Sequence, residues 1–381
     1  MAWQEMSVRD QRQEFVLLAS LEGANVSALC QRFGISRQTG HLWLRRYRAG
    51  ETGFEDRSRR PHASPMRTSA ELEARLLAVR EAHPAWGARK IAFVLKEEGQ
   101  PPPAVSTIHA VLARHGRIAP GAVTQGGYGS FEHDRPNELW QMDFKGKVRL
   151  RSGLWCHPLV ILDDHSRYAI EVSAHTDEQA LTVQNRLTAA FRHYGLPNAI
   201  YVDNGSPWGG GVPGQWTGLA VWLLKLGVRT IHGTPYHPQG RGKIERFNRS
   251  LVAEVFALNL LNDLADAQAA FDRWRPIYNH LRPHQSLGFE RPASRYRPSA
   301  RPYPETLPEP EYAAHDCVRR VGTTKAYISF KGRMHKLPQA FAGEKVAVRP
   351  HGPDGHFIVC YGAHVIAKID LTSPLPQEPE L

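Results

Sequence analysis

The chain has 381 residues, enough for two to four compact domains that each bury a hydrophobic core without disulfide bonds or a structural metal. Lysine and arginine number 48 against 37 aspartate and glutamate residues, a formal net charge of +11. This excess favours a polyanionic partner, although basicity alone does not distinguish DNA, RNA and an anionic membrane. The four cysteines are scattered, with no CxxC pair and no Cys/His spacing suited to zinc, so we expect unpaired thiols.

The N-terminal sequence argues against export. MAWQEMSVRDQRQEF has no apolar segment behind a basic start, and no uncharged apolar run elsewhere is long enough to span a bilayer. We therefore expect a cytoplasmic protein with no membrane partner.

Residues 1–62 are predicted to form a helix-turn-helix DNA-binding domain. Phe15, Leu18 and Leu21 give the first helix an apolar stripe at helical spacing. Gly34 can adopt a left-handed turn, and Ser36 can cap the helix that follows. That helix would meet DNA at its start and carry basic residues for phosphate, and the predicted DNA contacts are Arg37, Gln38, Thr39, Arg45, Arg46 and Arg48. The alternative is an ordinary three-helix bundle with a solvated basic face.

Residues 66–118 are predicted to form a second helix-turn-helix-like domain behind a joint rich in proline and serine. One helix is expected over about 69–83, a second opens near residue 86, and three prolines at 101–103 precede a short third helix. Ser106 and Thr107, near the start of that third helix, are the predicted DNA contacts. A helical spacer is the alternative interpretation.

A glycine-rich stretch over 119–129 is expected to be a linker, and the catalytic core is predicted to occupy residues 131–292. The predicted elements are three strands, a helix, a strand, a helix, a strand and two helices, over 139–148, 154–162, 168–173, 177–194, 199–202, 217–226, 228–231, 242–260 and 264–281. This order is typical of a ribonuclease-H-like α/β fold, in which helices cover both faces of a mixed sheet.

A second linker, crowded with Pro, Arg and Tyr, is expected over 291–310. Beyond it, short strand-like runs separated by glycine turns predict a small β-barrel over residues 311–372. The fold class is therefore multidomain: all-α helix-turn-helix modules, a ribonuclease-H-like α/β core and a β-barrel.

Three acidic residues of the core lie at positions that call for a functional explanation. Asp143 lies in the middle of the first core strand, Asp203 follows a short apolar strand, and Glu245 lies on a helix behind a basic loop. Converging carboxylates repel one another unless cations lie between them, and oxygen-rich sites suit Mg²⁺ or Mn²⁺. Two such ions about 4 Å apart can promote phosphodiester hydrolysis or transesterification. The rival acids Asp163 and Asp164 are interpreted as turn and salt-bridge residues near Arg167.

The segments WQMDF, YVDNGSPW and HPQGRGKIERFNRSL resemble the three blocks of the DDE integrase-core transposases of bacterial insertion sequences, relatives of retroviral integrases. The resemblance runs over roughly 137–292. It implies that Asp143 and Asp203 hold one metal ion and that Glu245 completes a second site. Lys243 corresponds to a basic residue beside the scissile phosphate, although an exposed lysine at a helix start is equally compatible; Arg241 and Arg249 are further predicted DNA contacts.

Two departures from retroviral integrases accompany this resemblance. The interval between Asp203 and Glu245 is longer, and the stretch 208–216 can absorb the excess as a surface loop. The zinc-binding N-terminal module is replaced by helix-turn-helix units, which shifts the resemblance towards insertion sequences.

The resemblance implies a Mg²⁺-dependent transposase acting on bacterial nucleoid DNA. It would bind the terminal inverted repeats of an element, nick the DNA to free a 3′-OH and join that end to target DNA, as a homo-oligomer on DNA. One alternative is a DNA-binding regulator with a catalytically silent integrase core. Another is a ribonuclease or junction resolvase of the same fold.

Overall fold

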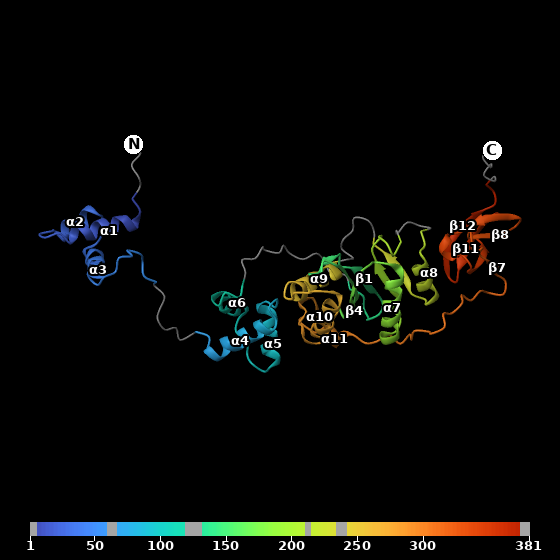
Figure 1. The fold of residues 1–381 in the computed structure, drawn as a ribbon, viewed down its shortest axis with the longest axis horizontal. Coiled ribbons are helices and arrows are strands. Elements are labelled where there is room, and N and C mark those ends of the chain that lie inside the picture. The colour runs from blue at the N-terminus through green and yellow to red at the C-terminus, as the bar shows by residue number, and fades with distance from the viewer. Residues whose placement is uncertain (1–5, 59–66, 119–131, 210–214, 234–241, 374–381) are drawn as a thin grey trace. The chain divides into compact units, whose positions relative to one another are not determined.

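The computed structural model describes residues 6–58, 67–118, 132–209, 215–233 and 242–373 (Figure 1). The chain divides into two units, residues 1–69 and 70–381. The expected linker over 119–129 lies outside the described residues. Within the described ranges, no helix is both long enough and apolar enough to cross a membrane.

The first unit is a three-helix domain with the predicted helix-turn-helix. Its helices are α1 (Val8–Ala19), α2 (Val26–Arg32) and α3 (Arg37–Arg48). Gly34 has a φ of 65°, in the left-handed region, and the Ser36 hydroxyl caps α3 by accepting from the backbone N–H of Thr39 at 3.1 Å. Both sequence predictions are confirmed. The prediction that Leu21 continues the apolar stripe of the first helix is wrong. Leu21 is 64% exposed, because α1 ends two residues earlier.

Gly40 lies at a position in the core of this domain that has no room for a side chain. A Cβ there would lie 2.5 Å from the Cys30 sulfur and 2.8 Å from Cζ of Phe15, both core residues. We expect Gly40→Ala to destabilise the domain by about 1–3 kcal/mol through overpacking, although alanine favours helix. Hydrogen exchange of peptides from α1 to α3 measures this loss. Gly53→Ala is the matched control, since a Cβ there meets nothing within 4 Å; equal exchange in the two variants would contradict the expectation.

The second unit begins with the other predicted three-helix module. It contains α4 (Ala70–Ala82), α5 (Ala88–Glu97) and α6 (Val105–Arg114). The helices meet in an apolar cluster centred on Leu76, Ile91 and Ile108. Lys90 Nζ lies 3.9 Å from a carboxylate oxygen of Glu254, which ties α5 to the core domain.

The core domain contains a six-stranded mixed sheet. Its strands are β1 (Trp140–Phe144), β2 (Val148–Arg149), β3 (Trp155–Asp163), β4 (Ala169–His175), β5 (Ala199–Val202) and β6 (Arg229–His232). They run in the order β2-β3-β1-β5-β6, with β4 on β3; β1, β5 and β6 are parallel, and the other pairs are antiparallel. The ribonuclease-H-like order is confirmed, but the predicted first strand is too long. It breaks after Phe144 because Gly146 turns the chain with a φ of 88°.

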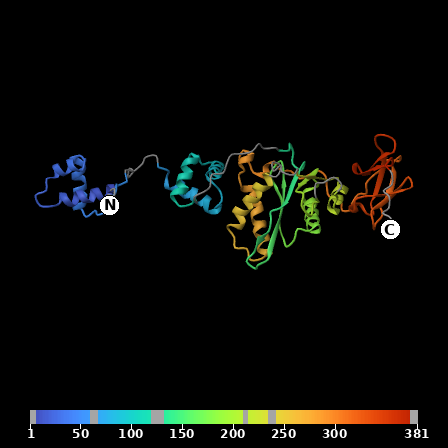
Figure 2. The same cartoon turned by 90° about the horizontal axis from the view of Figure 1, so that it is seen from above.

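Helices cover both faces of this sheet. The core-domain helices are α7 (Ala180–Tyr194), α8 (Gly218–Lys225), α9 (Gly242–Leu251), the π-helix η2 (Val252–Phe256), α10 (Leu264–Pro276), the π-helix η3 (Ile277–Leu281), the 3-10 helix η4 (Gln285–Leu287) and α11 (Pro292–Arg295). In Figure 2 the yellow and orange α9 and α10 lie on one side of the sheet and the green α7 on the other. One apolar cluster packs α7 and α8 on Trp140 and Met142, and a second packs α9 and α10 on Val160 and Leu162.

The segment after α11 was expected to be a linker, and the structure corrects this. The guanidinium of Arg301 donates to the carbonyl oxygens of Pro197 at 2.9 Å and Leu226 at 2.8 Å. Tyr296 is buried, and its hydroxyl donates to the Asn137 side chain at 3.0 Å. Residues 296–303, which we call the strap, therefore belong to the core domain. Composition misled the prediction because the strap is held by side chains rather than by a regular backbone pattern.

The C-terminal domain is built from antiparallel sheets. Its elements are β7 (Cys317–Arg320), β8 (Tyr327–Phe330), β9 (Arg333–Lys336), the 3-10 helix η5 (Gln339–Phe341), β10 (Lys345–Pro350), β11 (His356–Tyr361) and β12 (His364–Asp370). They pair as a four-stranded sheet, β12-β11-β10-β7, and a separate hairpin, β8-β9, around one apolar cluster. The prediction of a β-rich domain is confirmed. The strands pair as two sheets rather than as one continuous barrel, and β9 was not predicted.

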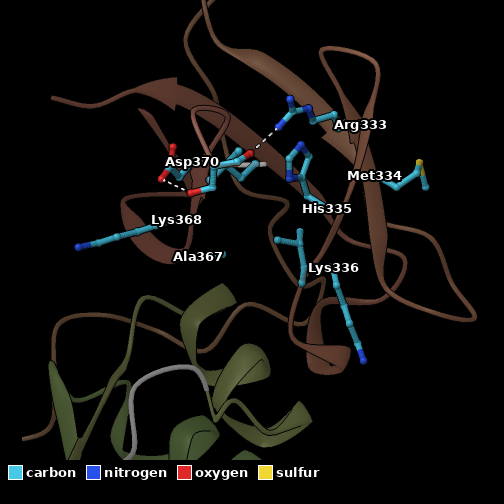
Figure 3. A pocket seen from close by; sticks show the side chains of 10 residues that line it. Arg333, Met334, His335, Lys336, Ala367, Lys368 and Asp370 are labelled. Atoms are coloured by element: carbon cyan, nitrogen blue, oxygen red, sulfur yellow. Dashed lines mark hydrogen bonds between the residues drawn. The ribbon is translucent and has the colours of Figure 1, made fainter. Parts of the chain in front are cut away.

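A cavity of about 330 Å³ lies between β9 and β12 (Figure 3). Arg333, Lys336 and Lys368 are among its lining residues, and Arg333 spans it by donating to the carbonyl oxygen of Leu371 at 3.2 Å. None of the three predicted catalytic acids lines this cavity, so it is a feature of the C-terminal domain alone.

Candidate active site

Asp143 and Asp203 lie at the carboxyl ends of neighbouring parallel strands. β1 and β5 pair with Trp140 opposite Ile200, and each acid lies three residues beyond its member of this pair. Both acids therefore lie at the same edge of the sheet, at the ends of adjacent strands. The carboxyl ends of parallel strands are where α/β sheets present functional groups.

The turn after β5 fixes the Asp203 main chain and side chain. The backbone N–H of Gly205 donates to Oδ1 of Asp203 at 2.9 Å, and Nδ1 of His232 donates to the Asp203 carbonyl oxygen at 3.1 Å. The Asn204 amide donates to the carbonyl oxygen of Gly233 at 2.9 Å, which links the turn to the end of β6. A side chain at Gly205 would crowd the carboxylate, since its Cβ would lie 3.3 Å from Oδ1.

The third acid is carried by α9, which packs against the same strand. Ile244, Phe247 and Leu251 form the buried face of the helix. The Asn248 amide donates to Oδ2 of Asp143 at 3.1 Å. Glu245 is exposed and precedes Asn248 by three residues, so the two side chains lie on neighbouring positions of one helix face.

The three carboxylates are not gathered as a ligand set in this structure. Among the described residues, no group of three or more His, Cys, Asp or Glu side chains could hold a metal ion. The structure thus brings Asp143 and Asn248 into contact and places Asp203 and Glu245 nearby on the adjoining turn and helix. The predicted DNA contact Arg241 lies in 234–241, outside the described residues.

The available donors suit a hard divalent cation. The side chains concerned offer carboxylate and amide oxygens, which are the ligands that Mg²⁺ and Mn²⁺ prefer. Oδ1 of Asn248 is buried beside Asp143 and has no hydrogen-bond partner in the described part of the chain. A buried acceptor without a donor needs an explanation, and a cation or its bound water would supply one.

Lys243 is held inside the protein rather than presented to solvent. Its Nζ donates to Oδ1 of Asp164 at 2.5 Å, and the two side chains are 15% and 2% exposed. Asp164 also accepts from the Gln141 amide at 2.8 Å and from the backbone N–H of His133 at 3.0 Å. Burial alone would raise the pKa of Asp164, but Lys243 and His133 together hold it below its usual value. The sequence did not single out Gln141 or His133.

Asp163 has a structural environment. It accepts from the backbone N–H of Asn137 at 2.7 Å and from the N–H and hydroxyl of Ser166 at 2.8 and 2.5 Å. Burial raises its pKa, although these hydrogen bonds oppose the shift. Arg167 forms its ion pair with Glu132 at 2.9 Å. These contacts fit the interpretation of Asp163 and Asp164 as turn and salt-bridge residues.

The predicted DNA contacts of the first domain differ in their surroundings. Arg37, Gln38, Arg45 and Arg48 are exposed, whereas Thr39 is half-buried at the start of α3. Arg46 is also half-buried, and it donates to Glu51 at 2.8 Å and lies 4.2 Å from the centre of the Trp43 ring. Arg46 therefore stabilises the segment after α3. The exposed arginines of this helix are more accessible than Arg46 to a phosphate group.

The remaining predicted DNA contacts lie on two other helices. Ser106 is exposed and Thr107 half-buried in the first turn of α6, the helix that follows the turn of the second module. Arg249 is exposed on α9. These placements are compatible with the predicted contacts.

The sheet order, the acids at its edge and the flanking three-helix modules define a class: a ribonuclease-H-like integrase core joined to helix-turn-helix domains. Family models agree along the chain. A helix-turn-helix domain matches residues 11–62, a homeodomain-like domain 39–112, two integrase core domain models 133–238 and 226–292, and the IS481 family transposase C-terminal domain 316–375.

Curated relatives include proteins of insertion elements. An uncharacterized 31.7 kDa protein of IS407 from Burkholderia multivorans is 29% identical over 171 residues, 43% of this chain and 58% of that protein. An uncharacterized 39.2 kDa protein of IS476 from Xanthomonas euvesicatoria is 26% identical over 285 residues, 72% and 78% of the two chains. The Gag-Pol polyprotein of Rous sarcoma virus is 33% identical over 123 residues, 32% of this chain and 7% of the polyprotein.

Solved structures give weaker matches. The intasome of simian T-cell lymphotropic virus, in complex with a PP2A regulatory subunit, gives a TM-score of 0.38 at 17% identity, covering 80% of this chain and 100% of that one. The catalytic core of BIV integrase gives 0.32 at 22% identity, covering 42% and 92%. The domain models and the insertion-element relatives carry this comparison: the chain has helix-turn-helix domains, an integrase core and a C-terminal domain that matches the one of IS481 family transposases.

Proposed function

We propose that this protein is a DNA transposase that cuts the ends of a mobile element and joins them to target DNA. The observation that carries the proposal is the placement of Asp143 and Asp203 at adjacent strand ends, with Asn248 of α9 on Asp143. Glu245, on the same face of α9, completes the proposed set. Such a group of oxygen donors fits phosphodiester chemistry supported by divalent cations.

The three acids have proposed roles as metal ligands. Asp143 and Asp203 would hold one Mg²⁺ between them, and Glu245 would complete a second site; Mn²⁺ would serve equally. When bound, such ions activate the attacking oxygen and stabilise the leaving oxygen. Asn248 keeps the Asp143 carboxylate oriented, and its buried Oδ1 has no hydrogen-bond partner among the described residues.

The same site would catalyse two successive displacements at phosphorus. In the first, water attacks the phosphodiester at the element end, the bond from phosphorus to the 3′ oxygen breaks, and the element is left with a 3′-OH. In the second, that 3′-OH attacks a phosphodiester of target DNA, and the target's own 3′ oxygen leaves with the proton. Each step breaks one phosphorus–oxygen bond and forms another, so no energy source is needed.

The helix-turn-helix domains would supply the recognition of DNA. The exposed residues at the start of α3 and α6 lie where such domains meet base edges, and the arginines of α3 suit phosphate. The partners are then the terminal inverted repeats and the target duplex. Since two element ends must be joined together, we propose that the active form is a homo-oligomer on DNA.

The test is cleavage and joining of a labelled duplex carrying the element's own end, in Mg²⁺, by the wild type and by Glu245→Gln. We expect the variant to lose both reactions by roughly a thousandfold while it still binds the duplex. Glu245 is exposed, so the substitution is not expected to disturb folding.

Three other outcomes would contradict parts of this proposal. Equal activity in the two proteins would place the catalytic centre elsewhere. Specific binding without reaction by either protein would favour a regulator with a silent integrase core. Cleavage of RNA–DNA hybrids, but not of element ends, would favour a ribonuclease.

A further inference from the structure

Beside the proposed site, a buried polar cluster joins three elements that carry or adjoin the acids. Its members are Gln141 of β1, Asp164 directly after β3 and Lys243 of α9. We propose that this cluster, which we call the latch, positions Glu245 against Asp143 and so sets the affinity of the site for its divalent cation. The inference rests on the proposed function and assigns Lys243 a positioning role.

Gln141 connects the strand and the helix directly. It precedes Asp143 by two residues, so both side chains lie on the face of β1 that α9 covers. Its Oε1 accepts from the backbone N–H of Ile244 at 3.3 Å, and its Nε2 donates to Asp164 at 2.8 Å. First-turn N–H groups of a helix have no partner within the helix, so this contact also caps α9.

Lys243 closes the latch from the helix side. Its ammonium reaches Asp164 at 2.5 Å, and the carboxylate is fixed independently by the backbone N–H of His133 at 3.0 Å. The latch thus holds α9 at positions 243 and 244, and Asn248 holds it again on Asp143. Glu245 lies between these two attachments, so its backbone has little freedom relative to the strand acids.

A direct contact between Lys243 and the scissile phosphate is the competing role. Moving the ammonium to DNA would leave Asp164 as a buried carboxylate without its cationic partner, which is strongly unfavourable. Arg249, exposed on the same helix, has no such constraint. The geometry therefore favours an internal role for Lys243 and leaves phosphate contact to exposed residues.

The experiment compares Lys243→Met, Asp164→Asn and their combination with the wild type, and uses Arg249→Met as the matched control. Three quantities are measured on the full chain: the Mg²⁺ concentration for half-maximal cleavage, DNA affinity by fluorescence anisotropy without divalent cation, and the rise in melting temperature on addition of Mn²⁺. Lys243→Arg, which keeps the charge, tests for rescue.

We expect each latch variant to raise the half-saturating Mg²⁺ concentration about tenfold and to diminish the Mn²⁺-induced shift. DNA affinity should stay within about twofold, and the double variant should be no worse than the poorer single variant. Lys243→Arg should lie nearer the wild type. Arg249→Met should show the opposite pattern, with weaker DNA binding and an unchanged Mg²⁺ requirement.

The latch is overturned if Lys243→Met weakens DNA binding as Arg249→Met does, or if the effects of the two latch substitutions multiply. It is also overturned if the Mn²⁺-induced shift is retained in every variant. Should the wild type bind Mn²⁺ but not cleave, the proposed function fails, and the Mn²⁺ shift alone decides the latch: its loss in Lys243→Met supports the latch.

Discussion

Asp143→Asn is expected to abolish strand cleavage and joining together, by roughly a thousandfold or more, without loss of folding. The substitution keeps the shape of the side chain and an oxygen that can accept from Asn248. It removes one of the two carboxylates that stand at the ends of the adjacent strands β1 and β5. Without divalent cation, the variant should be at least as stable as the wild type, because a repulsion between like charges is removed.

The discriminating measurement is thermal unfolding with and without Mn²⁺. Wild-type protein should be stabilised by about 2.7 kcal/mol when the cation is present at a hundred times its dissociation constant, and Asp143→Asn should show little of this gain. Asp272→Asn, an exposed isosteric change on α10, serves as the control and should behave as the wild type. A variant that retains the Mn²⁺ stabilisation would show that Asp143 is not a ligand.

Glu254→Ala is expected to destabilise the core domain by about 3–5 kcal/mol. The Glu254 carboxylate is 8% exposed and accepts from Nε of Arg282 at 2.8 Å and from the Trp274 indole at 2.9 Å. Lys90 lies 3.9 Å away. Removing the acid leaves the 11%-exposed Arg282 and the indole without their acceptor, and leaves Lys90 without its counter-ion.

Hydrogen exchange of peptides from α10 reports this loss locally, in a chain whose domains need not unfold together. Glu305→Ala is the matched control: it also breaks an arginine–carboxylate pair, with Arg192, but its side chain is 67% exposed. An exposed pair contributes little to stability because solvent screens it. Similar protection in the two variants would mean that the buried cluster around Glu254 does not stabilise the core.

Much of the fold could be predicted because the chain's periodicities are strong. The apolar spacing of Ile244, Phe247 and Leu251 predicts the buried face of α9, and the short run at 199–202 predicts β5. The same logic failed at Leu258, which is 48% exposed. Val255 keeps the predicted burial, but the π-helix η2 ends at Phe256, so Leu258 lies beyond the helix and the helical period no longer sets its position.

The site was less predictable than the fold because it depends on pairs distant in sequence. Spacing and turn chemistry single out Asp143 and Asp203, but the partner of Lys243 is a carboxylate 79 positions away. A glutamine in the middle of an apolar strand was an available signal, since buried polar side chains need partners. Which partners it finds, Ile244 N–H and Asp164, follows only from the packing of α9 on β1.

The strap determines the length of the linker between the core domain and the C-terminal domain. Because residues 296–303 are anchored to the core domain, the connection to β7 shrinks to about 306–316, which spans at most about 40 Å when fully extended. Part of this connection already contacts the C-terminal domain, since the Tyr312 hydroxyl donates to the carbonyl oxygen of Lys345 at 2.5 Å. A tether this short gives an effective concentration in the millimolar range. Even weak contacts of the C-terminal domain, such as Lys225 of α8 with Glu344 at 2.7 Å, are then heavily populated. Any DNA that binds the C-terminal domain through this surface therefore has to compete with the tethered core domain.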